Sequence, residues 1–142
     1  METPEQARVE SERGAVAAQI SREIVQLHAT MFGRGPTKAK TYVDDEYVLC
    51  VLEDIYTPAE RTLIKADKVE EVVSARHAFQ EAVEEDFTAI VTGATGRPVR
   101  AFMSQVKVEP ELAAELFLME PISGDGADPI AGDGDGGDPI TA

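Results

Sequence analysis

Three cations and two glycines fall within one short segment of a strongly acidic chain. The run Gly-Arg-Gly-Pro-Thr-Lys-Ala-Lys contains Arg34, Thr37, Lys38 and Lys40. A glycine-rich turn that carries guanidinium, ammonium and hydroxyl donors can hold a small anion such as phosphate, carboxylate or bicarbonate. The spacing differs from the GxxxxGK[ST] pattern, which argues against nucleotide hydrolysis. The sequence therefore predicts a small-anion site here, and Arg97 joins it if two predicted hairpins lie side by side.

The same segment also has a plainer interpretation. Gly33 is a typical helix terminator, and the Gly35-Pro36 pair prevents the helix from continuing. Lysines are then expected at the exposed positions of the strand that follows. Both interpretations stay open at the level of sequence.

The other reactive side chains favour structural roles. His28 and His77 lie on helical stretches, without an HExxH pattern or a cysteine partner. Cys50 lies in an apolar segment, where a packed thiol is the usual state. The Asp-Gly run near the C-terminus lacks the closing glutamate of a calcium loop. We therefore predict no catalytic residue, no metal site and no cofactor.

Length and charge limit the class of protein. The 142 residues suit one domain, and the 43% hydrophobic content is normal for a packed core. The formal net charge of −14 argues against nucleic-acid binding, which needs basic groups to displace counterions. Apolar runs are too short to cross a bilayer, so direct membrane insertion is not expected. With one cysteine and a polar N-terminus, these features predict a soluble cytoplasmic protein.

Apolar periodicity predicts the elements that position these side chains. Helical spacing of apolar residues marks 14–32 and 68–92, and a Thr-Pro-Ala-Glu capping box opens a short helix at residue 57. Strands are expected over 40–43, 47–53, 98–108 and 113–119. The order α-β-β-α-α-β-β predicts a two-layer α+β domain with an antiparallel four-stranded sheet and helices on one face.

The predicted domain covers 14–121, between two segments of different character. Residues 1–13 form a polar lead-in. Residues 122–142 form an acidic tail rich in Gly, Asp and Pro, with five aspartates and no basic residue, and are expected to be disordered. Within the domain, the segment 47–53 is apolar on both of its faces, which indicates an interior strand or an interface.

Four motifs resemble those of a known family. They are FGRGP, TPAERTL, TGR and FMSQ, at 32–36, 57–63, 95–97 and 102–105. Together they are similar to the small MpsC-like proteins, and the resemblance covers Gly14 to Glu120. The chain departs from that pattern at Tyr56, where the family has Leu, and at Val91-Thr92, where it has Val-Glu. The resemblance implies a component of a cation-translocating, membrane-potential-generating system that is associated with uptake of inorganic carbon. It brings no catalytic residues.

Two hypotheses about function follow. The first is a non-enzymatic accessory or regulatory module that forms a homo-oligomer, most simply a dimer, or pairs with a membrane protein that carries the transport. The alternative is a small-anion-binding domain or enzyme that uses Arg34, Lys38 and Lys40 together with Arg97. The alternative requires these side chains to converge on one pocket.

Overall fold

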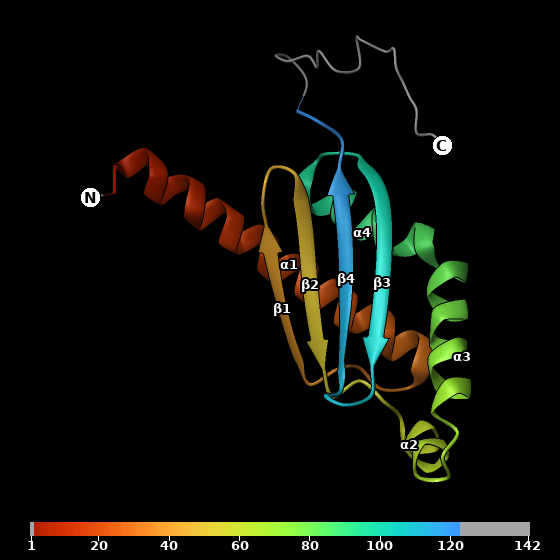
Figure 1. Ribbon diagram of the computed structural model, residues 1–142. Helices are drawn as coiled ribbons and strands as arrows, with labels where there is room; N and C mark the ends of the chain where they lie inside the picture. Colours follow the sequence, from red (N-terminus) through yellow and green to blue (C-terminus); the bar gives the residue numbers. More distant parts are fainter. Residues whose placement is uncertain (1, 123–142) are drawn as a thin grey trace, which may run out of the picture.

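Helices cover one face of an antiparallel sheet in the computed structural model, which describes residues 2–122 (Figure 1). The elements in chain order are α1 (Pro4–Phe32), β1 (Lys38–Val43), β2 (Tyr47–Glu53), α2 (Pro58–Lys65), α3 (Val69–Ala82), α4 (Glu84–Thr95), β3 (Val99–Lys107) and β4 (Leu112–Met119). This is the predicted α+β class. The predicted acidic tail lies outside the described residues, apart from Ile122.

The sheet has the strand order β1-β2-β4-β3, and all its pairings are antiparallel. Each hairpin pairs consecutive strands, and β2 joins β4 to unite the two hairpins. The segment 47–53, which is apolar on both faces, is therefore an interior strand, β2. This is the first of the two interpretations that its sequence allowed. The outer strands β1 and β3 are the sheet edges.

The first helix begins ten residues earlier than its apolar pattern predicts. Thr3 caps it: the hydroxyl of Thr3 accepts the N–H of Gln6 at 3.0 Å, while the Gln6 side chain accepts the N–H of Thr3 at 2.9 Å. Pro4 follows at the first helical position, where it suits the helix. The lead-in predicted at 1–13 is thus helical from residue 4. Its side chains are largely exposed, so apolar periodicity could not reveal it.

The predicted helix 68–92 is two helices, α3 and α4. Val83 lies between them with φ −114° and ψ 24°, outside the regular helical range. Three acidic residues follow it, and a helix N-terminus favours negative charge, so a fresh start here is favourable. Gly96, with φ 72°, ends α4 in the left-handed conformation that glycine adopts freely.

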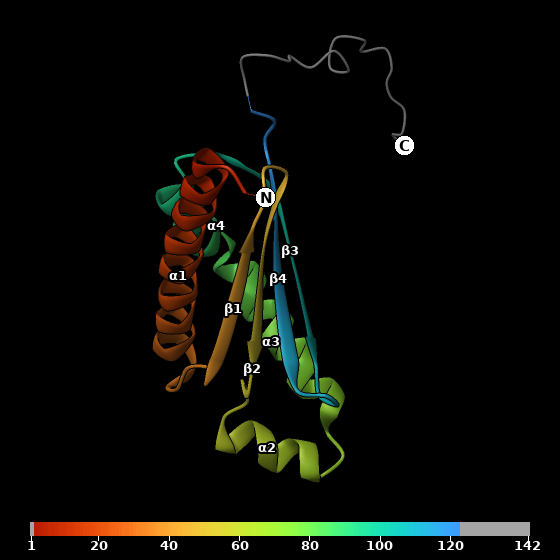
Figure 2. The same cartoon turned by 90° about the vertical axis from the view of Figure 1, so that its left-hand side faces the viewer.

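The hydrophobic core lies between the helices and one face of the sheet. Ile20 and Ile24 of α1 and Phe87 of α4 are fully buried. They meet the buried side chains of the sheet, among them Val48, Cys50, Leu52, Ala113 and Phe117. Seen edge-on, α1 and α4 lie on one side of the strands (Figure 2), and in the face-on view no helix of residues 2–122 lies over the other side (Figure 1).

Candidate functional site

Arg34 and Thr37, two of the predicted anion-binding residues, donate their hydrogen bonds to acceptors within the same chain. Arg34 follows the end of α1, and its guanidinium donates to the carbonyl of Tyr56 at 2.7 Å and to the carboxylate of Asp54 at 3.0 Å. The hydroxyl of Thr37 donates to the same Asp54 oxygen at 2.9 Å. Asp54 therefore takes the place that a bound anion would have. The bond from Thr37, with the charges of Arg34 and Arg61, lowers the pKa of Asp54 below its ordinary value.

The two predicted lysines lie on the uncovered face of the sheet. The ammonium of Lys38 is 4.0 Å from the carboxylate of Glu53, and both side chains are exposed. The ammonium of Lys40 is 5.6 Å from the centre of the Tyr42 ring. Neither lysine bonds to Asp54. The segment 34–40 therefore divides its cations between an internal network and an open surface.

Arg97 lies at the opposite end of the sheet and does not join the other cations. Its guanidinium donates to the carbonyl of Glu120 at 2.9 Å, next to the first residue of β3. Lys38 instead pairs with Glu53, which pairs with Leu112 at the start of β4. The eight residues of β4 separate the two ends by about 25 Å, given a rise of about 3.3 Å per residue. The five residues Arg34, Thr37, Lys38, Lys40 and Arg97 thus form no single anion pocket.

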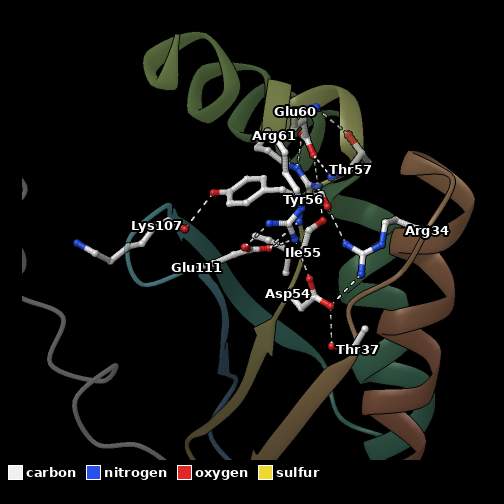
Figure 3. Close-up of polar contacts among 11 residues, drawn as sticks. Arg34, Thr37, Asp54, Ile55, Tyr56, Thr57, Glu60, Arg61, Lys107 and Glu111 are labelled. Atoms are coloured by element: carbon white, nitrogen blue, oxygen red, sulfur yellow. Dashed lines mark hydrogen bonds and ion pairs between the residues drawn. The ribbon is translucent and has the colours of Figure 1, made fainter. Parts of the chain in front are cut away.

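An ion-pair network occupies the end of the sheet where Asp54 lies (Figure 3). Arg61, from α2, donates to Asp54 at 2.8 Å and to both carboxylate oxygens of Glu111 at 3.0 and 2.9 Å. Glu111, in the turn between β3 and β4, also accepts the backbone N–H of Tyr56 at 3.0 Å. With Arg34 and Thr37, these residues form what we call the end network. It joins α1, α2 and both hairpins.

A buried arginine continues this network into the core. Arg76 of α3 is fully buried, and its guanidinium donates twice to the carboxylate of Glu60, at 2.7 and 2.6 Å. It also donates to the carbonyl of Ile55 at 2.6 Å, and it lies 3.8 Å from the centre of the Phe32 ring. Burial alone raises the pKa of Glu60, but the bonds from Arg76 and the Thr57 backbone outweigh it and lower that pKa overall.

Groups that could act as nucleophiles near this region are not activated. Burial raises the pKa of Cys50 to about 11, so its thiol stays protonated at neutral pH. Burial likewise raises the pKa of Tyr56 to about 12, and its hydroxyl donates to the carbonyl of Lys107 at 3.0 Å. Among residues 2–122 no three His, Cys, Asp or Glu side chains lie together as a metal site would require.

A second polar cluster lies under the sheet, and the sequence did not reveal it. Glu115 of β4 is fully buried, with its carboxylate 3.6 Å from the imidazole of His28 on α1 and 3.2 Å from the Gln80 amide on α3. Ser104 of β3 donates to the Gln80 carbonyl oxygen at 2.5 Å. Since one Glu115 oxygen and both His28 nitrogens have no partner among the described residues, this cluster is only partly satisfied.

The uncovered side of the sheet carries an apolar patch next to Lys38 and Lys40. Cross-strand pairing aligns one side chain from each strand in a row, Tyr42–Leu49–Leu116–Met103, and a second row holds Tyr47 and Leu118. We call the surface formed by these six residues the open face. Tyr42 and Met103 are 48% and 50% exposed, and they are informative because they belong to one contiguous row of apolar side chains. A continuous apolar patch of this kind marks an interaction site in proteins.

These features define a small two-layer α+β protein with a pinned polar end and an apolar sheet face. A family model for the Na+-translocating membrane potential-generating system (MpsC) matches residues 12–121. The chain therefore belongs to the MpsC family, as the four motifs indicated. No curated protein and no solved structure matches the chain. Among the described residues, none of the helices has the length and apolar character needed to cross a membrane.

Proposed function

We propose that this protein is a non-enzymatic accessory module of a Na+-translocating, membrane-potential-generating system. The observation that carries the proposal is the family match over residues 12–121. In this proposal a membrane-protein partner carries the transport, and this chain acts on the cytoplasmic side of that partner. The system's link to inorganic-carbon uptake makes bicarbonate-dependent growth a relevant readout.

The polar chemistry of the chain supports a role without catalysis. Arg34 and Arg61 are bound to carboxylates of the same chain, and Arg76 is bound to Glu60. The thiol of Cys50 is buried and protonated at neutral pH. A surface for binding is present instead, since the open face exposes large apolar side chains. We therefore propose that the protein works through binding, as a homo-oligomer that pairs with a membrane protein.

A deletion strain tests the accessory role. We expect loss of this chain to reduce the Na+-dependent part of the membrane potential, measured with a potential-sensitive dye, and to slow growth at low inorganic carbon. Added bicarbonate should restore growth, and a sodium-free medium is the control. If the potential responds to sodium equally with and without the chain, the accessory role is wrong.

Two conservative variants test the absence of catalysis. Cys50→Ala and Tyr56→Phe each remove one reactive group and leave most packing in place. We expect both variants to restore the deletion strain as the parent chain does. Circular dichroism confirms that they fold. A folded variant that fails to restore the strain would point to chemistry at that residue and contradict a purely binding role.

A further inference from the structure

We propose that the open face binds the open face of a second copy of this chain, with the strands of the two copies running in opposite directions. The inference deepens the proposed function, because it assigns the surface and the arrangement of the self-association. It rests on the register of the sheet, on its exposed side chains and on the distribution of charge at the two ends of the open face.

The first step is the continuity of the apolar surface. The row Tyr42–Leu49–Leu116–Met103 crosses the whole sheet without a charged residue, because each member faces the next across a strand pairing. Tyr47 and Leu118 extend it along the strands. Leu49 and Leu116 sit at the centre on the two interior strands, where a partner would exclude water most completely. Such a surface matches the apolar centre of a dimer interface.

The second step is area. Four strands about 4.8 Å apart and eight residues rising about 3.3 Å each give the whole uncovered side of the sheet a size of about 19 by 26 Å, of which the open face is the apolar part. Its projected area is about 500 Å², and side-chain relief raises the accessible area towards the roughly 800 Å² that each partner buries in a stable dimer. Sheets pack face to face about 10 Å apart in just this way. The uncovered side of the sheet, made of the open face and the neighbouring rows that begin at Lys38 and Lys40, is therefore large enough to hold a second copy.

The third step is charge. At one end of the open face, β1 presents Lys38 and Lys40, which line a shallow hollow with Tyr42 and Glu53. The Glu53 carboxylate lies 4.0 Å from Lys38, and Lys40 has no carboxylate within ion-pair distance in residues 2–122. At the other end, the β1–β2 turn presents Asp44, Asp45 and Glu46, and only Asp45 has a cation within ion-pair distance in residues 2–122, at 2.7 Å from Arg13. The two ends of one strand thus carry opposite charges.

Opposite ends select one symmetric arrangement. A two-fold axis that runs across the strands places each β1 over its copy in reverse direction, so the lysines of one copy meet the acidic turn of the other. An axis along the strands would instead bring the two basic ends together and the two acidic ends together. Like charges across an interface are unfavourable, so the first arrangement is selected.

Another occupant of this face fits less well. Residues 123–142 contain two isoleucines as their large apolar side chains, together with five aspartates. That composition cannot match a surface with six large apolar residues. A second copy supplies the same six side chains and the complementary charges at once.

Sedimentation equilibrium of the full chain tests the dimer. At about 100 µM we expect the wild type to be dimeric, since interfaces of standard size have micromolar or tighter dissociation constants. Tyr42→Glu with Met103→Glu should weaken the dimer by about 100-fold, because two exposed anchors become charged. Leu63→Glu is the matched control: Leu63 is 41% exposed on α2, which lies beyond the end of the sheet (Figure 1), and its substitution should leave the dimer unchanged. Circular dichroism verifies the fold of each variant.

A charge swap tests the arrangement with exposed residues that folding tolerates. Lys40→Glu should weaken the dimer by about 10-fold, and adding Asp44→Lys should restore it, because the two changes exchange the charges that meet across the interface. A dimer that resists the face substitutions, as pairing through the edges of β1 or β3 would, overturns the proposal.

The outcomes separate this inference from the proposed function. A wild-type monomer whose face variants lose capture of the membrane subunit would overturn the second copy as occupant and leave the accessory role intact. A dimer that responds as described, in a strain whose membrane potential does not depend on the chain, would uphold the interface and reject the accessory role.

Discussion

Arg76 is the residue on which several elements of this protein converge. Its guanidinium bonds to Glu60 of α2 and to the carbonyl of Ile55, and it stacks against Phe32 of α1. A buried ion pair contributes modestly in itself, but removing one partner leaves the other charge uncompensated. The Arg76 side chain therefore contacts or belongs to three helices, α1, α2 and α3, and fixes their mutual positions. Substituting it should destabilise the fold, because the charge of Glu60 would then be buried without a partner.

We predict that Arg76→Met lowers the free energy of unfolding by about 3–5 kcal/mol, because the carboxylate of Glu60 loses its buried partner. Urea denaturation followed by circular dichroism measures the change. Adding Glu60→Gln should recover much of the loss, since the amide removes the charge and its oxygen can still accept the N–H of Thr57. An equal loss in the single and double variants would contradict this explanation.

Arg61→Ala is the matched exposed case. Arg61 bonds to Asp54 and Glu111, but its side chain is 44% exposed. Exposed ion pairs contribute about 0–1 kcal/mol each, so we expect a much smaller loss than for Arg76→Met. A loss as large as that of the buried arginine would show that exposure does not govern these pairs.

The carboxylate of Glu60 makes stability depend on pH. Its pKa in the folded protein lies below the ordinary value of 4.5, so the unfolded chain binds its proton first. The stabilisation is therefore complete above about pH 4.5 and is lost as the pH falls through the lowered pKa. We predict that the difference in unfolding free energy between wild type and Glu60→Gln, measured by urea denaturation, shrinks between pH 7 and pH 3. A constant difference would contradict this.

The sequence could identify some of these residues by type but not by partner. Thr57 and Glu60 form the predicted capping box, because a cap depends only on neighbours in the chain. Arg34 was assigned to an anion, yet its partner Asp54 is 20 residues away and becomes a neighbour only when the sheet forms. Arg76 lies on the apolar stripe of its helix, and this position was the sequence feature that could have indicated a buried ion pair. The sequence alone could not indicate that its partner is Glu60.

At the scale of elements, local patterns predicted the fold well. Apolar alternation predicts all four strands, and glycines predict where α1 and α4 end. Both signals depend only on neighbouring residues in the chain. The sequence did not predict the break at Val83, since the apolar stripe continues through both helices and the three acidic residues that favour a new helix start also fit an exposed helical face. The first turns of α1 were missed because they bury almost nothing.

A truncation tests how little those first turns contribute. We predict that deleting residues 2–11 changes the free energy of unfolding by less than about 1 kcal/mol, because these side chains are exposed and their ion pairs are superficial. Circular dichroism should still show a loss of helix. Ile20→Ala, in the fully buried part of the same helix, is the comparison and should cost about 2–5 kcal/mol.

At the scale of the whole molecule, charge opposes the self-association that the open face favours. The formal net charge is −14, of which five units lie in residues 123–142. Two copies of one acidic chain repel each other, and salt screens this repulsion within about 10 Å at 0.1 M. The apolar rows must therefore supply the attraction, while the lysines and the acidic turn set its direction.

Removing residues 123–142 should tighten the dimer at low salt. We predict a lower dissociation constant for the shortened chain at about 0.02 M salt, and convergence of the two chains at about 0.5 M, where repulsion is screened. Sedimentation equilibrium at both salt concentrations measures this. If the shortened chain dimerises more weakly at low salt, those residues take part in the contact.

The end network also has a kinetic meaning. Arg61 and Glu111 are separated by 50 residues in the chain, and Tyr56 and Glu111 by 55, so their bonds close only after both hairpins have met. We expect interactions that form this late to contribute little in the transition state for folding and to act mainly on the rate of unfolding. On this view the end network slows unfolding without accelerating folding, and it thereby lengthens the lifetime of each folded molecule.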